Sequence, residues 1–145
     1  MRTLIFIAAL LAWPAFAAFD VTDAKPDLVE MKTIIEGENP GDAIAPLYDW
    51  LVKKPKDADA LNLLGYAYRR LQRFDRARIY YDRALAVEPA HLGALEYLGE
   101  LELQTGNPEA AKGLLHRLRA ACPAGCHELN DLLKAFSDYE VSTFD

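Results

Sequence analysis

The fold of this chain is decided by residues 58–89, which read ADALNLLGYAYRRLQRFDRARIYYDRALAVEP. The regularly spaced residues of this stretch are Leu61, Leu64, Gly65, Tyr68, Ala77, Tyr81, Ala84 and Pro89. Gly65 and Ala77 are small where two helix axes must approach each other, and large side chains such as Tyr81 fill the space between the helices. The stretch therefore predicts two closely packed antiparallel helices.

The same pattern returns along the chain with a period of 34 residues. One period later stand Leu95, Leu98, Gly99, Ala111, Leu115 and Pro123, and one period earlier stand Ala43, Leu47, Trp50 and Pro55. The Asn-Pro pairs at residues 39–40 and 107–108 lie two periods apart, at the turn between the two helices of a unit. In spacing and residue types the sequence resembles the tetratricopeptide-repeat family, whose unit is a helix–turn–helix of this length.

The resemblance implies an all-α fold, a right-handed α-solenoid of three helix pairs closed by a C-terminal capping helix. The three repeats are expected at residues 26–56, where the pattern is divergent, and at residues 57–90 and 91–124. Stacking of at least three such units is needed to bury a continuous core. The period continues into a capping helix at residues 125–139, whose apolar positions are Leu129, Leu132, Leu133 and Phe136. The tail at residues 140–145 has no period and is expected to fray.

Composition limits the classes of function. The chain has 145 residues, of which 52% are apolar, and a formal net charge of -6. The apolar content is enough for one small domain, and the net acidity disfavours nucleic-acid binding, because phosphate contacts need a basic face. Six arginines gather in the central repeat and are expected to form a solvated surface. They are Arg69, Arg70, Arg73, Arg76, Arg78 and Arg83.

The N-terminal residues 1–17, MRTLIFIAALLAWPAFA, predict a secretory signal peptide that is cleaved after Ala17. The apolar run from Leu4 to Trp13 is too short to span a bilayer, and small residues at Ala15 and Ala17 suit a cleavage site. The alternative is a membrane anchor, in which case the uncleaved leader would be the only contact with the membrane. We expect an exported, periplasmic bacterial protein in which residues 18–25 form a short lead-in.

The resemblance also implies a binding site, because the family holds peptides or partner helices in a concave groove lined by the first helix of each repeat. Carried over position by position, the groove residues are Lys32, Asn62, Tyr66, Arg69, Glu96 and Glu100. Glu96 and Glu100 would repel a carboxylate, so a C-terminal carboxylate ligand is not expected. They could attract a basic or polar segment, and Tyr66 could give a rigid amphipathic contact. The alternative is an ordinary solvated helix face.

Cys122 and Cys126 are the only two cysteines and flank the junction between the third repeat and the capping helix. In an exported protein such a pair predicts an intramolecular disulfide. Pro123 should end the preceding helix and Gly125 can take a positive φ, so the turn can fold back. Two alternatives involve His127. The spacing is one residue too long for covalent haem attachment, but it resembles the copper-binding Cys-x3-Cys pairs of some exported metallochaperones.

No catalytic signature emerges, since the sequence has no phosphate-binding glycine loop, metal-binding helix pair or nucleophile elbow. We therefore expect a non-enzymatic scaffold or adaptor without cofactor or metal, which holds a protein or peptide segment, in a cell-envelope assembly. One alternative is a periplasmic redox or copper-handling protein that uses Cys122 and Cys126. Another is a structural protomer that self-associates through an end of the stack.

Overall fold

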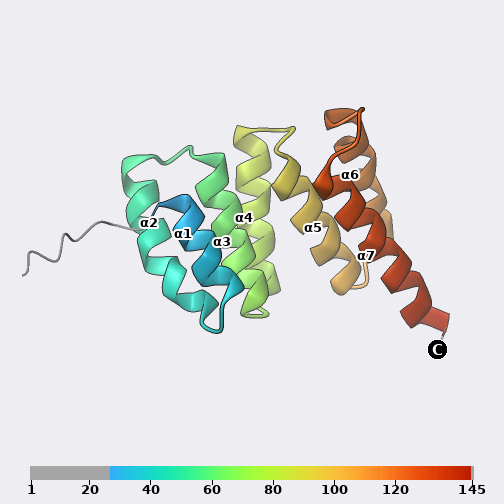
Figure 1. Cartoon of the computed structure of the whole chain (residues 1–145), viewed down its shortest axis with the longest axis horizontal. Coiled ribbons are helices and arrows are strands. Elements are labelled where there is room, and N and C mark those ends of the chain that lie inside the picture. Colours follow the sequence, from blue (N-terminus) through green and yellow to red (C-terminus); the bar gives the residue numbers. More distant parts are fainter. Residues whose placement is uncertain (1–26, 145) are drawn as a thin grey trace, which may run out of the picture.

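The structure is a computed structural model that describes residues 27–144, and this part of the chain contains helices and no strand. The helices follow one another as α1 (Leu28–Glu36), the short 3-10 helix η1 (Pro40–Ala43), α2 (Ile44–Lys53), α3 (Ala58–Arg70), α4 (Phe74–Val87), α5 (Leu92–Gln104), α6 (Pro108–Ala121) and α7 (His127–Phe144). Figure 1 shows them as a single row of stacked helices that begins with α1 and α2 and ends with α7. The all-α helical-repeat fold predicted from the sequence is confirmed. The expected signal peptide and lead-in lie outside the described residues.

The row is built from helix pairs that pack on one another. α3 packs chiefly against α4, and α5 packs chiefly against α6, while α4 also contacts α5 and joins the two pairs. α7 has no partner helix after it and packs against α5 and α6. Leu132 of α7 is fully buried, so this helix covers the end of the core as a capping helix should.

Two side chains one period apart cap the N-termini of α3 and α5, the first helices of the second and third pairs. Asp57 accepts a hydrogen bond from the Ala60 backbone nitrogen at 3.1 Å and caps α3. His91, 34 residues later, does the same for α5 through Nδ1, which accepts from the Ala94 nitrogen at 3.1 Å. Such caps satisfy N–H groups that have no partner within the helix. Asn39 makes no such bond, and the chain after it forms the 3-10 helix η1 before α2 begins.

The first and last helices differ from the predicted bounds. Asp27 is the N-cap of α1, with its side chain accepting from the Glu30 nitrogen at 2.9 Å, so the first helix begins at Leu28, two residues after the predicted start of the first repeat at residue 26. At the other end, α7 continues through the tail that was expected to fray and ends at Phe144. The apolar period marks only the part of α7 that packs on other helices. A helix can extend beyond that part because its hydrogen bonds are made within the segment.

α3 and α4 approach each other closely at Gly65 of α3. A Cβ atom at this position would lie 2.5 Å from two ring carbons of Tyr81, which belongs to α4 and is fully buried. The Tyr81 hydroxyl has no hydrogen-bond partner within residues 27–144, so the ring contributes through its volume rather than its polar end. Gly99 has the corresponding place in α5, where a Cβ would lie 2.8 Å from the Leu132 side chain of α7.

Four of the six clustered arginines are exposed, as expected from composition, and two are not. Arg69 and Arg78 are partly buried and form ion pairs that the sequence did not predict, to Glu100 and to Glu102 respectively. An exposed member of the cluster, Arg70, also has fixed partners, because it donates to the backbone carbonyl of Ile35 at 2.8 Å. The expectation of a solvated surface was therefore wrong for Arg69 and Arg78.

The ion pair between Arg78 of α4 and Glu102 of α5 lies within the stack. Glu102 stands one period after Tyr68 and is only 5% exposed, so its carboxylate has lost most of its water. A buried carboxylate needs a nearby cation and hydrogen bonds to offset this loss. Arg78 supplies the cation and thereby links the second helix pair to the third.

We expect Gly65→Ala to lower the free energy of unfolding by about 1–3 kcal/mol, because the added methyl group overlaps a ring that has no room to move. Gly113→Ala in α6 is the matched control, since a Cβ there meets nothing within 4 Å. Alanine favours a helix over glycine by about 1 kcal/mol, so this variant should be stabilised. Thermal unfolding followed by circular dichroism compares the two. A Gly65→Ala protein at least as stable as the wild type would contradict the packing.

We also expect Arg78→Leu to destabilise the protein by about 3 kcal/mol, because it leaves the Glu102 carboxylate buried without its cation. Adding Glu102→Leu should recover most of that loss, since both charges are then gone. Urea unfolding of the two single variants and the double variant gives the coupling energy. Additive effects of the two substitutions would mean that the pair does not hold the helices together.

Candidate binding groove

A groove of about 920 Å³ runs along one face of α1, α3, α5 and α7. These are the first helices of the successive pairs together with the capping helix, and Figure 1 shows them following one another along the stack. All six residues that the sequence placed in a groove line this one: Lys32, Asn62, Tyr66, Arg69, Glu96 and Glu100. The structure therefore brings together side chains from three repeats on one surface.

The middle of the groove is aromatic. The rings of Tyr66 and Tyr97 are stacked, with centroids 4.8 Å apart and planes inclined by 19°. Tyr97 in turn lies against the buried ring of Tyr81, at a centroid distance of 6.2 Å. Burial raises the pKa of Tyr97, so its hydroxyl keeps its proton and remains neutral. The sequence analysis placed Tyr66 in the groove but not Tyr97, because Tyr97 stands one period after Leu63, which was not among the predicted groove positions.

Two of the predicted groove residues neutralise each other. Arg69 of α3 forms an ion pair with Glu100 of α5, and about one fifth of each side chain is exposed. The Arg69 Nε atom also donates to Gln104 at 3.2 Å. These contacts hold the guanidinium against α5, so Arg69 is not a free cation for a ligand.

Glu96 is a buried carboxyl in the groove wall and is only 6% exposed. Burial is the main reason why its pKa rises from 4.5 to about 8, and the nearby carboxylates of Glu100, Asp131 and Glu128 raise it further. Arg69 acts in the opposite direction but does not offset them. Burial therefore favours the protonated, neutral form of Glu96 at neutral pH.

Asn62 is a second buried polar group in the groove. It is 6% exposed, and its side-chain oxygen has no hydrogen-bond partner within residues 27–144. Opposite it stands Gly93 of α5, where a Cβ would lie 3.1 Å from the Asn62 amide nitrogen. Glycine at this position lets the Asn62 side chain pack directly against α5, and its oxygen is enclosed there without a partner.

His91 lines one edge of the groove, although the sequence analysis did not assign it to the site. His91 Nδ1 accepts the backbone bond that caps α5, so the ring proton must be on Nε2. Nε2 lies 3.0 Å from a carboxylate oxygen of Asp59 and can donate to it. The capping role has a signal in the sequence, because His91 stands one period after the cap residue Asp57.

The charge of the groove is acidic overall. Its lining contains six acidic side chains, Glu36, Asp59, Glu96, Glu100, Glu128 and Asp131, and three basic ones, Lys32, Arg69 and Arg70. The formal charge of the lining is therefore -3, or -2 when Glu96 carries its proton. Glu128 and Asp131 belong to the capping helix α7 and lie at the end of the groove.

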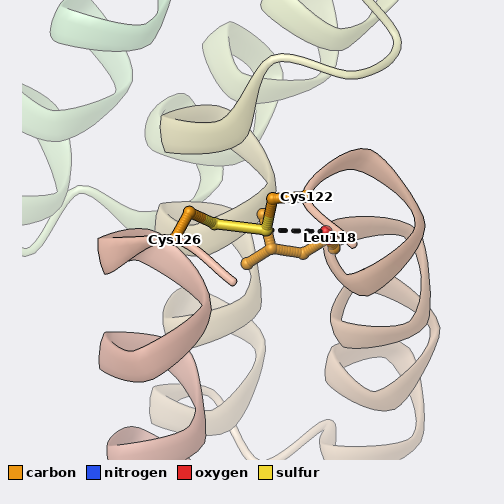
Figure 2. The surroundings of a disulfide bond; sticks show 3 residues. All are labelled: Leu118, Cys122 and Cys126. Atoms are coloured by element: carbon orange, nitrogen blue, oxygen red, sulfur yellow. Dashed lines mark hydrogen bonds between the residues drawn. A yellow bond between two sulfur atoms is a disulfide. The ribbon is translucent and has the colours of Figure 1, made fainter. Parts of the chain in front are cut away.

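Cys122 and Cys126 form a disulfide that joins the end of α6 to the start of α7 (Figure 2). Their Cα atoms are 6.0 Å apart, and Gly125 between them has the positive φ of 87° that such a turn requires. Oxidised in this way, neither sulfur is a thiolate ligand. His127, the third ligand of the alternative copper site, has Nδ1 2.9 Å from an Asp131 carboxylate oxygen.

Comparison with known proteins agrees with the fold. Residues 58–91 match the family model described as Tetratricopeptide repeat, and this match supports the family that the sequence pattern resembles. The matched residues include the whole of α3 and α4. A search of curated proteins found no match for the chain. Within the described residues, no helix combines the length and apolar character that crossing a bilayer requires.

Because the Glu96 carboxyl is buried, the free energy of unfolding should depend on pH. The folded chain holds this proton up to about pH 8, whereas the ordinary pKa of the carboxyl is 4.5. Between these values the folded state binds more protons than the unfolded state, so the contribution of Glu96 to stability falls as pH rises. Above about pH 8 the proton is absent from both the folded and the unfolded state, so the free energy of unfolding no longer falls with pH on account of Glu96.

We therefore expect Glu96→Gln to gain stability over the wild type as pH rises from 5 to 8, on the order of a few kcal/mol in total. Chemical unfolding at pH 5 to 9 measures the difference between the two proteins. Glu88→Gln, at an exposed glutamate that does not line the groove, is the control and should show no such trend. A difference between Glu96→Gln and the wild type that is the same at pH 5 and pH 9 would rule out a protonated Glu96.

Proposed function

We propose that this protein is an exported, non-enzymatic scaffold that holds a segment of another protein in the groove formed by α1, α3, α5 and α7. The observation that carries the proposal is the groove itself, whose volume is about 920 Å³ and whose lining comes from every helix pair. Tetratricopeptide repeats serve in general as scaffolds for protein–protein interaction. Stacked repeats create extended concave surfaces of this kind.

The lining suits a polypeptide ligand. The stacked Tyr66 and Tyr97 rings offer flat apolar area next to polar groups, a combination that favours binding to side chains of a partner. The lining is spread along four helices, so an extended or helical segment can contact more of it than a small molecule can.

We further propose that the protein works in the periplasm of a bacterium, as part of a cell-envelope assembly. The N-terminal residues 1–17 have the pattern of a signal peptide. The Cys122–Cys126 disulfide supports the same compartment, because disulfides persist in oxidising environments and are rare in the cytosol.

Site-specific photo-crosslinking in living cells tests the groove. A photoreactive residue in place of Lys32, which is exposed at the groove rim, should give covalent adducts with another protein. The matched control is the same residue in place of Ile79, which is 56% exposed on α4 and does not line the groove. Adding Tyr66→Ala to the Lys32 variant should reduce the yield of adducts. Equal adduct patterns from Lys32 and Ile79, or no adducts from Lys32, would overturn the proposal.

A further inference from the structure

We propose that the bound segment places a lysine or arginine side chain at the α5–α7 end of the groove, against Glu96 of α5 and the carboxylates of Glu128 and Asp131 of α7. This inference rests on the proposed function and adds to it the chemistry of one ligand side chain. The groove should therefore prefer segments that carry a lysine or arginine at this position over segments that carry none.

Two buried polar groups in the groove wall lack partners. Glu96 and Asn62 are each 6% exposed, and both line the groove. Within residues 27–144 the Asn62 oxygen accepts no hydrogen bond, and Glu96 takes part in no hydrogen bond or ion pair. Buried polar groups in folded proteins are almost always paired. The Asn62 oxygen is enclosed by the protein, whereas Glu96 lines the groove, so a ligand there can supply the partner that Glu96 lacks. A carboxyl is best matched by a cationic donor.

The charges around Glu96 leave this end of the groove without a free cation. On its own helix, Glu100 is negative and Tyr97 is neutral. From α3 comes the guanidinium of Arg69, which is already paired with Glu100. From α7 come Glu128 and Asp131, with His127 in contact with Asp131. α4 presents Tyr81, behind Tyr97. The charged side chains of α6 are all exposed: Glu109, Lys112, Arg117 and Arg119, together with His116.

A side chain fits this end better than a bare metal ion. Among residues 27–144, no group of three or more histidine, cysteine or acidic side chains is arranged to hold a metal. Beside Glu96, the Tyr66–Tyr97 stack supplies apolar area on which the aliphatic stem of a lysine or arginine can lie. The charged head then reaches the carboxylates while the rest of the segment follows the groove.

Binding of the cation involves one proton. In the empty groove Glu96 is a neutral carboxylic acid at pH 7, since burial and the neighbouring carboxylates raise its pKa to about 8. A bound ammonium or guanidinium stabilises the carboxylate form, so Glu96 releases its proton to the solvent and the ligand keeps its own charge. Affinity for a cationic segment should therefore increase as pH rises toward 8.

Two pools of acetylated, amidated nonapeptides test the inference on the full chain. One pool has lysine at the central position and the other has norleucine, while the remaining positions vary equally among uncharged residues. We expect the protein to enrich peptides from the lysine pool about tenfold over the norleucine pool, as a charged hydrogen bond in a partly buried site implies. This preference should be stronger at pH 8 than at pH 6.

Glu96→Gln should bind peptides from both pools with little preference, whereas the control Glu88→Gln should behave as the wild type. Equal enrichment of the two pools by the wild-type protein would overturn the cationic site while leaving the groove as a peptide-binding surface. Enrichment from neither pool would instead count against both the cationic site and the proposed function. A lysine preference that is unchanged in Glu96→Gln would also overturn the role given to Glu96.

Discussion

The contact between Gly65 and the Tyr81 ring is the constraint on which the rest of the structure depends. It lets α3 and α4 approach so closely that a methyl group would not fit between them. The same buried ring lies beneath Tyr97 of the next repeat, and Tyr97 stacks on Tyr66 in the groove. The packing inside one helix pair thereby determines where the aromatic surface of the groove stands.

Two buried glutamates of α5 show how the same residue type can serve packing or binding. Glu102 is 5% exposed and has Arg78 of α4 as its cation, so its charge is used within the stack. Glu96 is 6% exposed, has no such partner and lies in the groove wall. Burying an unpaired charge is so unfavourable that the group holds its proton instead. The energetic cost of this arrangement is a reason to connect Glu96 with ligand binding rather than with stability.

The capping helix contributes to both the end of the core and the groove. Leu132 of α7 fills the space beside Gly99 of α5, and thus covers apolar surface that a further repeat would otherwise bury. Near its start, α7 adds Glu128 and Asp131 to the groove lining. The disulfide from Cys122 to Cys126 ties this start to the end of α6. Closure of the stack and the acidic character of the groove therefore depend on one helix.

The sequence by itself determined the helix pairs and the positions of the six predicted groove residues. This was possible because the repeat returns every 34 residues and helical spacing places the same positions of each repeat on the same face. Only the tertiary structure decided how these side chains act. Arg69 and Glu100, which pair across adjacent helices, are 31 residues apart, so such neighbours do not share a position in the repeat. The raised pKa of Glu96 depends on its burial and on carboxylates from other parts of the stack. The part that α7 takes in the groove likewise depends on how the helices pack, and the 34-residue repeat alone does not specify such contacts.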